Sequence, residues 1–293
     1  MTPPKPRKAQ PIALEAGTTR RAAAHRALQE AHAHFLFNAS GLTAASGPEF
    51  VHQARVGLRR LRVFVRLFQA ELGGKRALRL ETELSWLFGK LGRTRDLQVF
   101  ASTVVPLLKL GPKPLAKLLA NLDPERRAAE AALDAALASA RFHALCRELA
   151  SVEARLNTPA KQRGTRKWLA RKLDRRRERI LEAGRALSSG SAAALHDLRK
   201  QVKKLRYVSE LAEALYAPKK QRLRRYQSDL KLLQETLGQL NDLAVARSLL
   251  PVLVPPPAKR KRLAAQLEQL RRDELERLPR SLERFQATKP IWK

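Results

Sequence analysis

The 293-residue chain has a single cysteine, Cys146, and only 5% of its residues are aromatic. One thiol cannot form an intramolecular disulfide, and no cluster of His and Cys has the spacing of a zinc site. A fold held together by disulfides or zinc is therefore excluded. Cys146 lies in the segment HALCREL, which is typical of a helix interior where cysteine packs as a small apolar residue. A free thiol favours the reducing cytoplasm as the location.

Long apolar runs are also missing. No run approaches the roughly 20 apolar residues of a membrane-spanning helix. The N-terminal residues MTPPKPRKAQP are basic and proline-rich, without the apolar stretch of a signal peptide. We therefore expect no membrane contact and a disordered basic tail over residues 1–11.

Motifs for catalysis are absent from the sequence. The chain has no Walker loop, no GxGxxG, and no Ser or Cys in a known nucleophile signature. His32 and His34 are two residues apart and point to different sides of a helix, which argues against a metal site between them. We expect a protein that is not an enzyme and that needs no cofactor or metal.

Acidic residues are few: 27 Asp and Glu stand against 59 Lys and Arg, which gives a formal net charge of +32. Such a surplus raises the self-repulsion of the folded chain unless an anion relieves it. Leu and Ala supply most of the 44% of residues that are hydrophobic, and no segment has the alternation of a strand. The composition predicts an all-α protein with a polyanionic ligand.

A basic pattern occurs twice. HQARVGLRRLR, which starts at His52, aligns without a gap with HDLRKQVKKLR, which starts at His196, at an offset of 196 − 52 = 144. In each copy basic residues follow the His at the same three intervals. The two sets are His52, Arg55, Arg59 and Arg62, and His196, Arg199, Lys203 and Arg206. At about 100° per residue each set falls within roughly 80°, so it forms one stripe along a helix. We call them the first and second basic stripes.

The apolar residues beside each stripe repeat with the spacing 3, 4, 3, which predicts that each helix packs through one face and displays its cations on the flank. The two apolar sets are Leu58, Leu61, Val65 and Phe68, and Leu195, Leu198, Val202 and Leu205. A flank stripe suits a groove or a seam between helices, where an extended polyanion could lie.

A second motif follows each stripe. LGRTRDLQV begins at Leu91 and LGQLNDLAV at Leu237, an offset of 237 − 91 = 146, with Arg95 of the first replaced by Asn241 in the second. We expect the two Gly to end or bend a helix, and the two Asp to cap the following helix or to pair with an Arg. Four further arginines are candidate ligand contacts between the motifs: Arg76, Arg79, Arg222 and Arg225.

These doubled motifs resemble the CHAD family, the conserved histidine α-helical domain, from about Thr18 to about Phe285. The resemblance implies a helical fold with pseudo-twofold symmetry whose basic central surface or pore binds inorganic polyphosphate. It carries the binding role onto both basic stripes. Neighbouring cations of the same segments complete the predicted binding set: Arg60, Lys200 and Lys204.

The fold that we predict is all-α, with two pseudo-symmetric four-helix bundles that arose by internal duplication and share a basic central groove or pore. The break near Asn157 divides the halves into residues 12–158 and 159–293.

The predicted function is non-catalytic binding of inorganic polyphosphate, in the cytoplasm and at polyphosphate granules. The alternative is sequence-nonspecific binding of nucleic acid, because a cationic surplus attracts any phosphate backbone. Few aromatics lie in the stripes, so a platform for stacked bases is not evident. A granule scaffold with a protein partner is a third reading. The two His either contact phosphate or support the helix packing.

Overall fold

The computed structural model describes residues 5–15, 17–42, 47–158, 164–187, 191–216, 220–254 and 257–292. Helices account for most of these residues, and no β-strand forms among them apart from one isolated bridge between Thr19 and Gly164. The predicted all-α fold is confirmed. The elements are α1 (Arg20–Ser40), α2 (Pro48–Leu67), α3 (Gln69–Leu72), α4 (Gly74–Val99), the π-helical turn η1 (Phe100–Val104), α5 (Val105–Leu107), α6 (Pro112–Leu137), α7 (Ala140–Leu156), α8 (Arg166–Arg185), α9 (Ala192–Leu215), α10 (Lys220–Leu253) and α11 (Pro257–Ala287).

The chain forms two compact units, each of which draws on both halves of the sequence. The first unit comprises Met1–Arg95, Ala128–Leu169 and Tyr207–Leu215, and the second comprises Asp96–Arg127, Ala170–Arg206 and Tyr216–Lys293. These units differ from the predicted halves 12–158 and 159–293, because segments from each half belong to the other unit. The predicted boundary itself adjoins residues 159–163, which lie outside the described residues.

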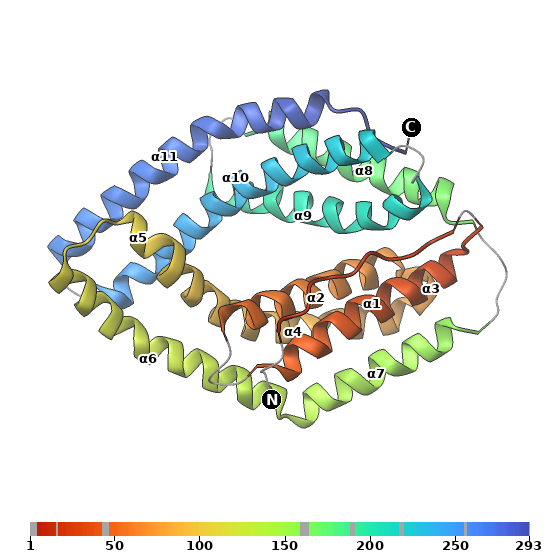
Figure 1. Cartoon of the computed structure of the whole chain (residues 1–293), viewed down its shortest axis with the longest axis horizontal. Helices are drawn as coiled ribbons and strands as arrows, with labels where there is room; N and C mark the ends of the chain where they lie inside the picture. Colours follow the sequence, from red (N-terminus) through yellow and green to blue (C-terminus); the bar gives the residue numbers. More distant parts are fainter. Residues whose placement is uncertain are drawn as a thin grey trace. The chain divides into compact units, whose positions relative to one another are not determined.

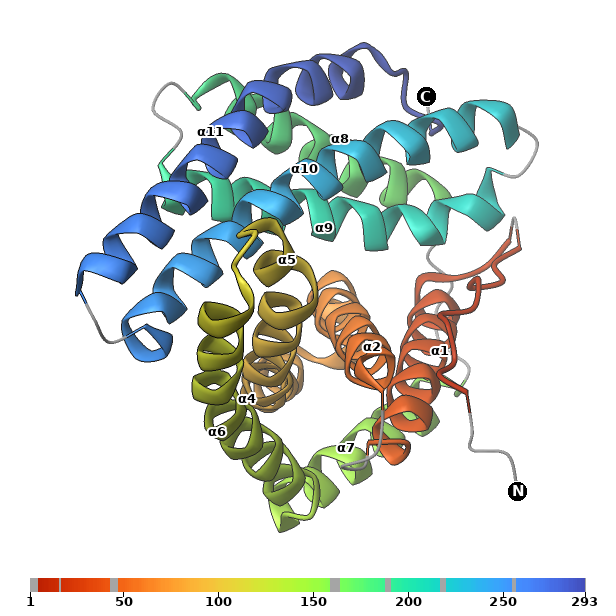
Figure 2. The ribbon, with the colours of Figure 1, turned by 60° about the vertical axis from the view of Figure 1, so that its left-hand side comes forward.

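Four helices of the first unit, labelled in Figures 1 and 2, contact one another in a ring. α1 packs against α2, and the arginines of α2 reach α4, as detailed below. An ion pair between Arg76 and Glu148 joins α4 to α7. The pair formed by His32 and Glu153 joins α7 back to α1. The apolar residues with the spacing 3, 4, 3 are buried, as that spacing predicts: Leu58, Leu61, Val65 and Phe68.

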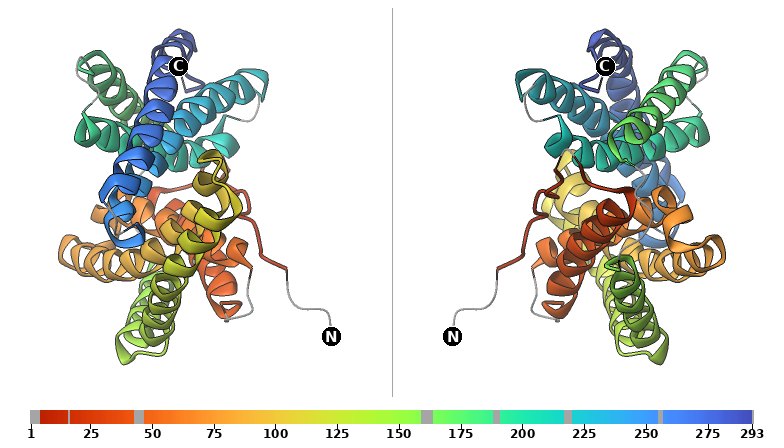
Figure 3. Two further views of the ribbon diagram at one scale, coloured as in Figure 1. Left: turned by 90° about the vertical axis from the view of Figure 1, so that its left-hand side faces the viewer. Right: turned by 90° about the vertical axis from the view of Figure 1, so that its right-hand side faces the viewer.

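The second unit repeats this order of contacts with α8, α9, α10 and α11. α8 and α9 line one surface hollow together, and Arg206 of α9 bonds to Gln234 of α10. α10 packs against α11 (Figures 1 and 3). Gly184 of α8 closes the ring because it lies against Leu282 of α11. Each unit thus has the contact pattern of a four-helix bundle; the duplication remains an inference from the sequence.

Two side-chain caps and one proline mark the first turns of three helices. Thr19 Oγ1 accepts a hydrogen bond from Ala22 N at the start of α1, and Ser139 Oγ accepts one from Phe142 N at the start of α7. Pro48 opens α2 in the first turn, where a backbone N–H has no partner within the helix.

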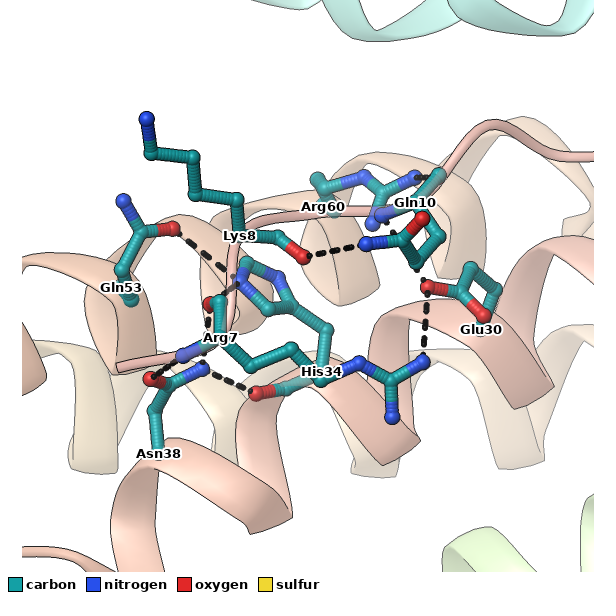
Figure 4. Close-up of polar contacts among 8 residues, drawn as sticks. All are labelled: Arg7, Lys8, Gln10, Glu30, His34, Asn38, Gln53 and Arg60. Atoms are coloured by element: carbon teal, nitrogen blue, oxygen red, sulfur yellow. Dashed lines mark hydrogen bonds and ion pairs between the residues drawn. The ribbon is translucent and has the colours of Figure 1, made fainter. Parts of the chain in front are cut away.

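The N-terminal segment packs against α1 from Arg7 onwards, which corrects the predicted disordered tail. Arg7 N donates to Asn38 Oδ1 at 3.0 Å, Asn38 Nδ2 donates back to Arg7 O at 3.0 Å, and His34 Nε2 lies 3.0 Å from the same carbonyl oxygen (Figure 4). Ile12 and Leu14 are buried. Buried side chains of α1 therefore supply the backbone partners that this extended segment lacks. Residues 1–4 of the predicted tail lie outside the described residues.

The close approach of α1 and α2 depends on Gly57. A Cβ atom there would lie 2.8 Å from the backbone of Phe35, which is too close for two carbon atoms. We expect Gly57→Ala to lower the free energy of unfolding by about 1–3 kcal/mol, because one of the helices must move. Gly89 of α4 has nothing within 4 Å of the same position, so Gly89→Ala should stabilise the protein by about 0.5–1 kcal/mol. Urea unfolding of both variants checks this. Equal effects of the two substitutions would contradict the close packing.

Candidate anion-binding site

The first basic stripe lies on the flank of α2 that faces α4. His52, Arg55, Arg59 and Arg62 are all half-buried there. The guanidinium carbons of the three Arg lie 4.6, 5.3 and 4.9 Å from the centre of one aromatic ring, that of Phe88 in α4. Arg59 Nη1 also lies 3.4 Å from the Tyr207 hydroxyl. Each cation is attracted to the ring face, an interaction worth about 0.5–2 kcal/mol. Phe88 therefore holds three like charges together.

Sequence reasoning missed Phe88. Few aromatics lie within the stripes in the sequence, but a ring from another helix contacts the first stripe. A signal was present: Phe88 stands three residues before Leu91, the first residue of the motif that follows the stripe. Phe88 therefore lies one helical turn before the motif. If the motif lies near the stripe, Phe88 lies near it as well.

The glycine of the first motif makes room for the stripe. A Cβ atom at Gly92 would lie 2.9 Å from Arg55 Nη1, whereas the equivalent atom at Gly238 would meet nothing within 4 Å. Both glycines lie inside continuous helices, α4 and α10. Neither glycine ends a helix, so that part of the expectation is wrong. At Gly92, the missing side chain admits a guanidinium group.

Crowding of the cations is visible in Arg62. Burial, and next the guanidinium groups of Arg66 and Arg59, lower the pKa of Arg62. An arginine stays charged at neutral pH even so. The lowered pKa records an electrostatic cost that a bound anion would offset.

The second basic stripe lies on α9 in the second unit and is held by amides. Arg206 Nη1 donates to Gln234 Oε1 at 3.0 Å, and His196 Nδ1 lies 3.3 Å from Asn241 Oδ1. Gln234 stands at the position equivalent to Phe88, since 88 + 146 = 234. His196 and Arg206 are exposed, and Arg199 and Lys203 are half-buried. The two stripes thus have corresponding positions but different supports.

The two motifs that follow the stripes each contain an aspartate, and Asp242 lies near charged side chains of the second stripe. Asp96 and Asp242 lie inside α4 and α10, so neither caps a following helix. Burial raises the pKa of Asp242, Arg199 and Lys203 oppose that shift, and Asp96 adds to it. The alternative role, interaction with neighbouring cations, is the one that the structure gives to Asp242.

His52 is surrounded by positive charge. Burial lowers its pKa below 6.5, Arg95 lowers it further, and Arg59 and Arg55 act in the same direction while Glu49 opposes them. The ring is therefore neutral at pH 7. Arg95 and Asn241 occupy equivalent positions, and each acts on the His of its own stripe.

Arg60 does not belong with the first stripe, which corrects its place in the predicted binding set. It is 1% exposed, its Nε donates to Glu210 Oε2 at 2.9 Å, and its Nη2 donates to Gln10 O at 3.2 Å (Figure 4). A buried guanidinium group with a carboxylate partner is not accessible to a polyanion. Arg60 instead connects α2, the N-terminal segment and the last turns of α9.

The other predicted cations have mixed surroundings. Arg76 pairs with Glu148 at 2.8 Å, and Arg222 Nη2 donates to Pro290 O at 3.3 Å. Lys200 pairs with Asp197 at 2.6 Å on the surface of α9. The remaining three are exposed or half-buried: Arg79, Arg225 and Lys204.

The part of the chain that the structure describes has neither a membrane-spanning helix nor a metal cluster. Every helix in it is too short or too polar to cross a bilayer. No three His, Cys, Asp or Glu side chains in it gather at distances suited to a metal ion.

The fold and the paired basic helices define an all-helical protein with a repeated cationic surface. The CHAD domain family model matches residues 26–251, and the chain belongs to this family. The crystal structure of the CHAD domain from the plant Ricinus communis is similar, with 26% identity and a TM-score of 0.80 over 97% of this chain and 98% of that one. PptA from Streptomyces chartreusis has the same fold, with 19% identity and a TM-score of 0.67 over 92% and 99% of the two chains. No curated protein matches the sequence.

The effect of Arg95 on the pKa of His52 can be tested by replacing Arg95 with Asn, the residue at the equivalent position 241 of the second half. We expect Arg95→Asn to raise the pKa of His52 towards 6.5, because a positive neighbour is removed while the burial remains. Arg93→Asn, an exposed residue of the same helix, is the matched control and should leave this pKa unchanged. NMR titration of the His52 ring measures both. An unchanged His52 pKa in the Arg95 variant would show that Arg95 does not contribute to the shift.

Proposed function

We propose that this protein binds inorganic polyphosphate through the two basic stripes, without catalysing a reaction. The observation that carries the proposal is the set of three guanidinium groups assembled on Phe88. Membership of the CHAD family supports it. A groove or pore shared by both stripes, and a location at polyphosphate granules, remain predictions.

The geometry of a stripe suits a linear polyanion. Its cations are one helical turn apart, at about 5.4 Å per turn, so a chain of phosphates can meet several of them in succession. Arginine supplies planar paired donors to phosphate oxygens, and Lys203 acts as a point charge. Side chains already held by Phe88, Gly92 and Gln234 lose less conformational entropy when a ligand binds.

Nucleic acid is less well suited to this site. Base stacking needs an aromatic face that a base can reach. The Phe88 ring is close to three guanidinium groups instead. The site therefore offers donors for phosphate without a platform for bases.

Charge reversal in both stripes tests the proposal. Arg59→Glu combined with Lys203→Glu should weaken polyphosphate binding by about 100-fold or more, since hydrogen bonds to charged groups are worth about 1.5–3 kcal/mol each. Circular dichroism should show unchanged helicity, because the stripes flank the apolar core. Fluorescence anisotropy with labelled long-chain polyphosphate measures the affinity.

The matched control changes the net charge equally, away from the stripes. Lys113→Glu combined with Arg280→Glu alters two exposed residues and should weaken binding only slightly. For the unsubstituted protein the logarithm of the affinity should fall with the logarithm of the salt concentration, by analogy with single strands at about −0.7 per phosphate contact. Equal losses in the two double variants would mean that net charge, and not the stripes, binds the ligand.

A further inference from the structure

A cavity of about 260 Å³ lies in the second unit, near the end of α10 and the start of α11. Its lining comes from the segment between α5 and α6, the first turns of α6, the last residue of α10 and the first turns of α11, which lie side by side in Figures 1 and 2. Asn121 Nδ2 of α6 donates to Leu253 O of α10 at 2.9 Å and joins two of these parts. No residue of either basic stripe lines the cavity. It is therefore separate from the polyphosphate site proposed above.

The walls of the cavity are aliphatic. Four of the leucines that line it are at most 7% exposed: Leu108, Leu118, Leu253 and Leu263. Leu110, Pro114 and Val254 extend this apolar surface. Pockets for drug-sized ligands have mainly apolar walls and volumes of about 300–1,000 Å³, so this cavity suits the apolar body of a smaller ligand, about one or two fused rings in size.

Cations surround the opening of the cavity. Four of its lining residues are exposed and positively charged: Lys109, Lys117, Lys259 and Arg262. No Asp or Glu is among the lining residues that the structure describes. Like charges gathered at one place repel one another unless an anion relieves them. An anionic group at the opening would therefore be attracted by several cations at once.

Two further features point to a ligand rather than to a gap in the packing. Gln266 lines the cavity, and its Oε1 is buried without a hydrogen-bond partner among the described residues. A buried amide oxygen in that state costs free energy until a donor reaches it. Lys109 has a φ of 45°, in the left-handed region that residues other than glycine seldom adopt. Backbone strain of this kind clusters at sites that hold ligands, and here it occurs at one of the four cations.

We propose that this cavity binds a small organic anion that has an apolar body of ring size and an N–H or O–H donor. The aliphatic walls contact the body, the cations at the opening bind the anionic group, and Gln266 Oε1 accepts a hydrogen bond from the donor. Inorganic polyphosphate has no apolar body to fill the cavity. A small anion has no row of phosphates to match a basic stripe. The two sites therefore select different ligands.

Indole-3-acetate is a suitable probe because it combines two fused rings, a carboxylate and a ring N–H. Amide NMR of Leu118 and Leu263 follows its binding, and their signals should shift in a saturable way below about 10 mM probe. Indole-3-ethanol, which has no charge, should bind about tenfold more weakly, and 1-methylindole-3-acetate, which has no N–H, about fivefold more weakly. Acetate, which has no apolar body, should leave the signals unchanged.

Substitutions at the opening test the site itself. Arg262→Glu should weaken the binding of indole-3-acetate about tenfold, because a charge-assisted hydrogen bond is lost. Lys261→Glu is the matched control and should leave the affinity nearly unchanged. Lys261 is exposed on the same helix and does not line the cavity, and its reversal changes the net charge equally. Gln266→Leu should remove the difference in affinity between indole-3-acetate and its N-methyl derivative.

Lys109→Gly separates a binding role from a structural one. Glycine adopts a positive φ without strain, so the midpoint of thermal unfolding should rise by about 2 °C. The same variant should bind indole-3-acetate several-fold more weakly, because one cation of the opening is lost. Circular dichroism verifies the fold of each variant.

Three results would each overturn the proposal and leave the cavity as a gap between helices. The first is the absence of saturable shifts at Leu118 and Leu263 with indole-3-acetate. The second is an equal affinity for indole-3-acetate and either of its derivatives. The third is an equal loss of affinity in Arg262→Glu and Lys261→Glu, which would mean that net charge alone attracts the probe.

Discussion

Repulsion between neighbouring cations is the constraint on which this site depends. Three arginines of α2 stand on one flank, half-buried and close to one aromatic ring. Like charges at such separations destabilise a folded protein unless something offsets them. Phe88 offers the negative face of its ring, Gly92 leaves space for Arg55, and the neutral form of His52 avoids a fourth charge. A bound polyanion would offset the remaining repulsion, because it neutralises all of the cations at once.

The two stripes meet this constraint in different ways. In the first unit the support is an aromatic ring, and the residue next to the stripe His is Arg95. In the second unit amides occupy the same positions, Gln234 and Asn241, and the stripe is more exposed. Amide oxygens accept hydrogen bonds from cations, whereas a ring attracts them without fixed directions. The equivalent helices thus carry the same charges in surroundings of different polarity.

The repeated stripes could be predicted from the sequence because helical phase depends only on local spacing. The all-α fold could be predicted because Leu and Ala supply most of the apolar residues and no segment has the alternation of a strand. The contact of the first stripe with Phe88 could not be predicted, because Phe88 lies on a helix more than twenty residues further along the chain. The helical phase could have distinguished Arg60 from the residues of the stripe, because at about 100° per residue Arg60 falls about 100° around the helix from Arg59. Its burial also needs Glu210 and the N-terminal segment, and these contacts are long-range. That segment was misjudged because its proline-rich composition says nothing of the buried His34 and Asn38 that hold its backbone.

The most direct test of the account is competition between polyphosphate and single-stranded DNA for the same protein. Both ligands should carry the same number of phosphates, at physiological salt, so that they bring the same number of phosphate groups to the protein. If the stripes bind phosphate groups and not bases, unlabelled polyphosphate should displace bound labelled polyphosphate at a concentration about tenfold or more below the concentration of DNA that does so. Equal or stronger competition by DNA would contradict the account and assign the basic stripes to nucleic acid.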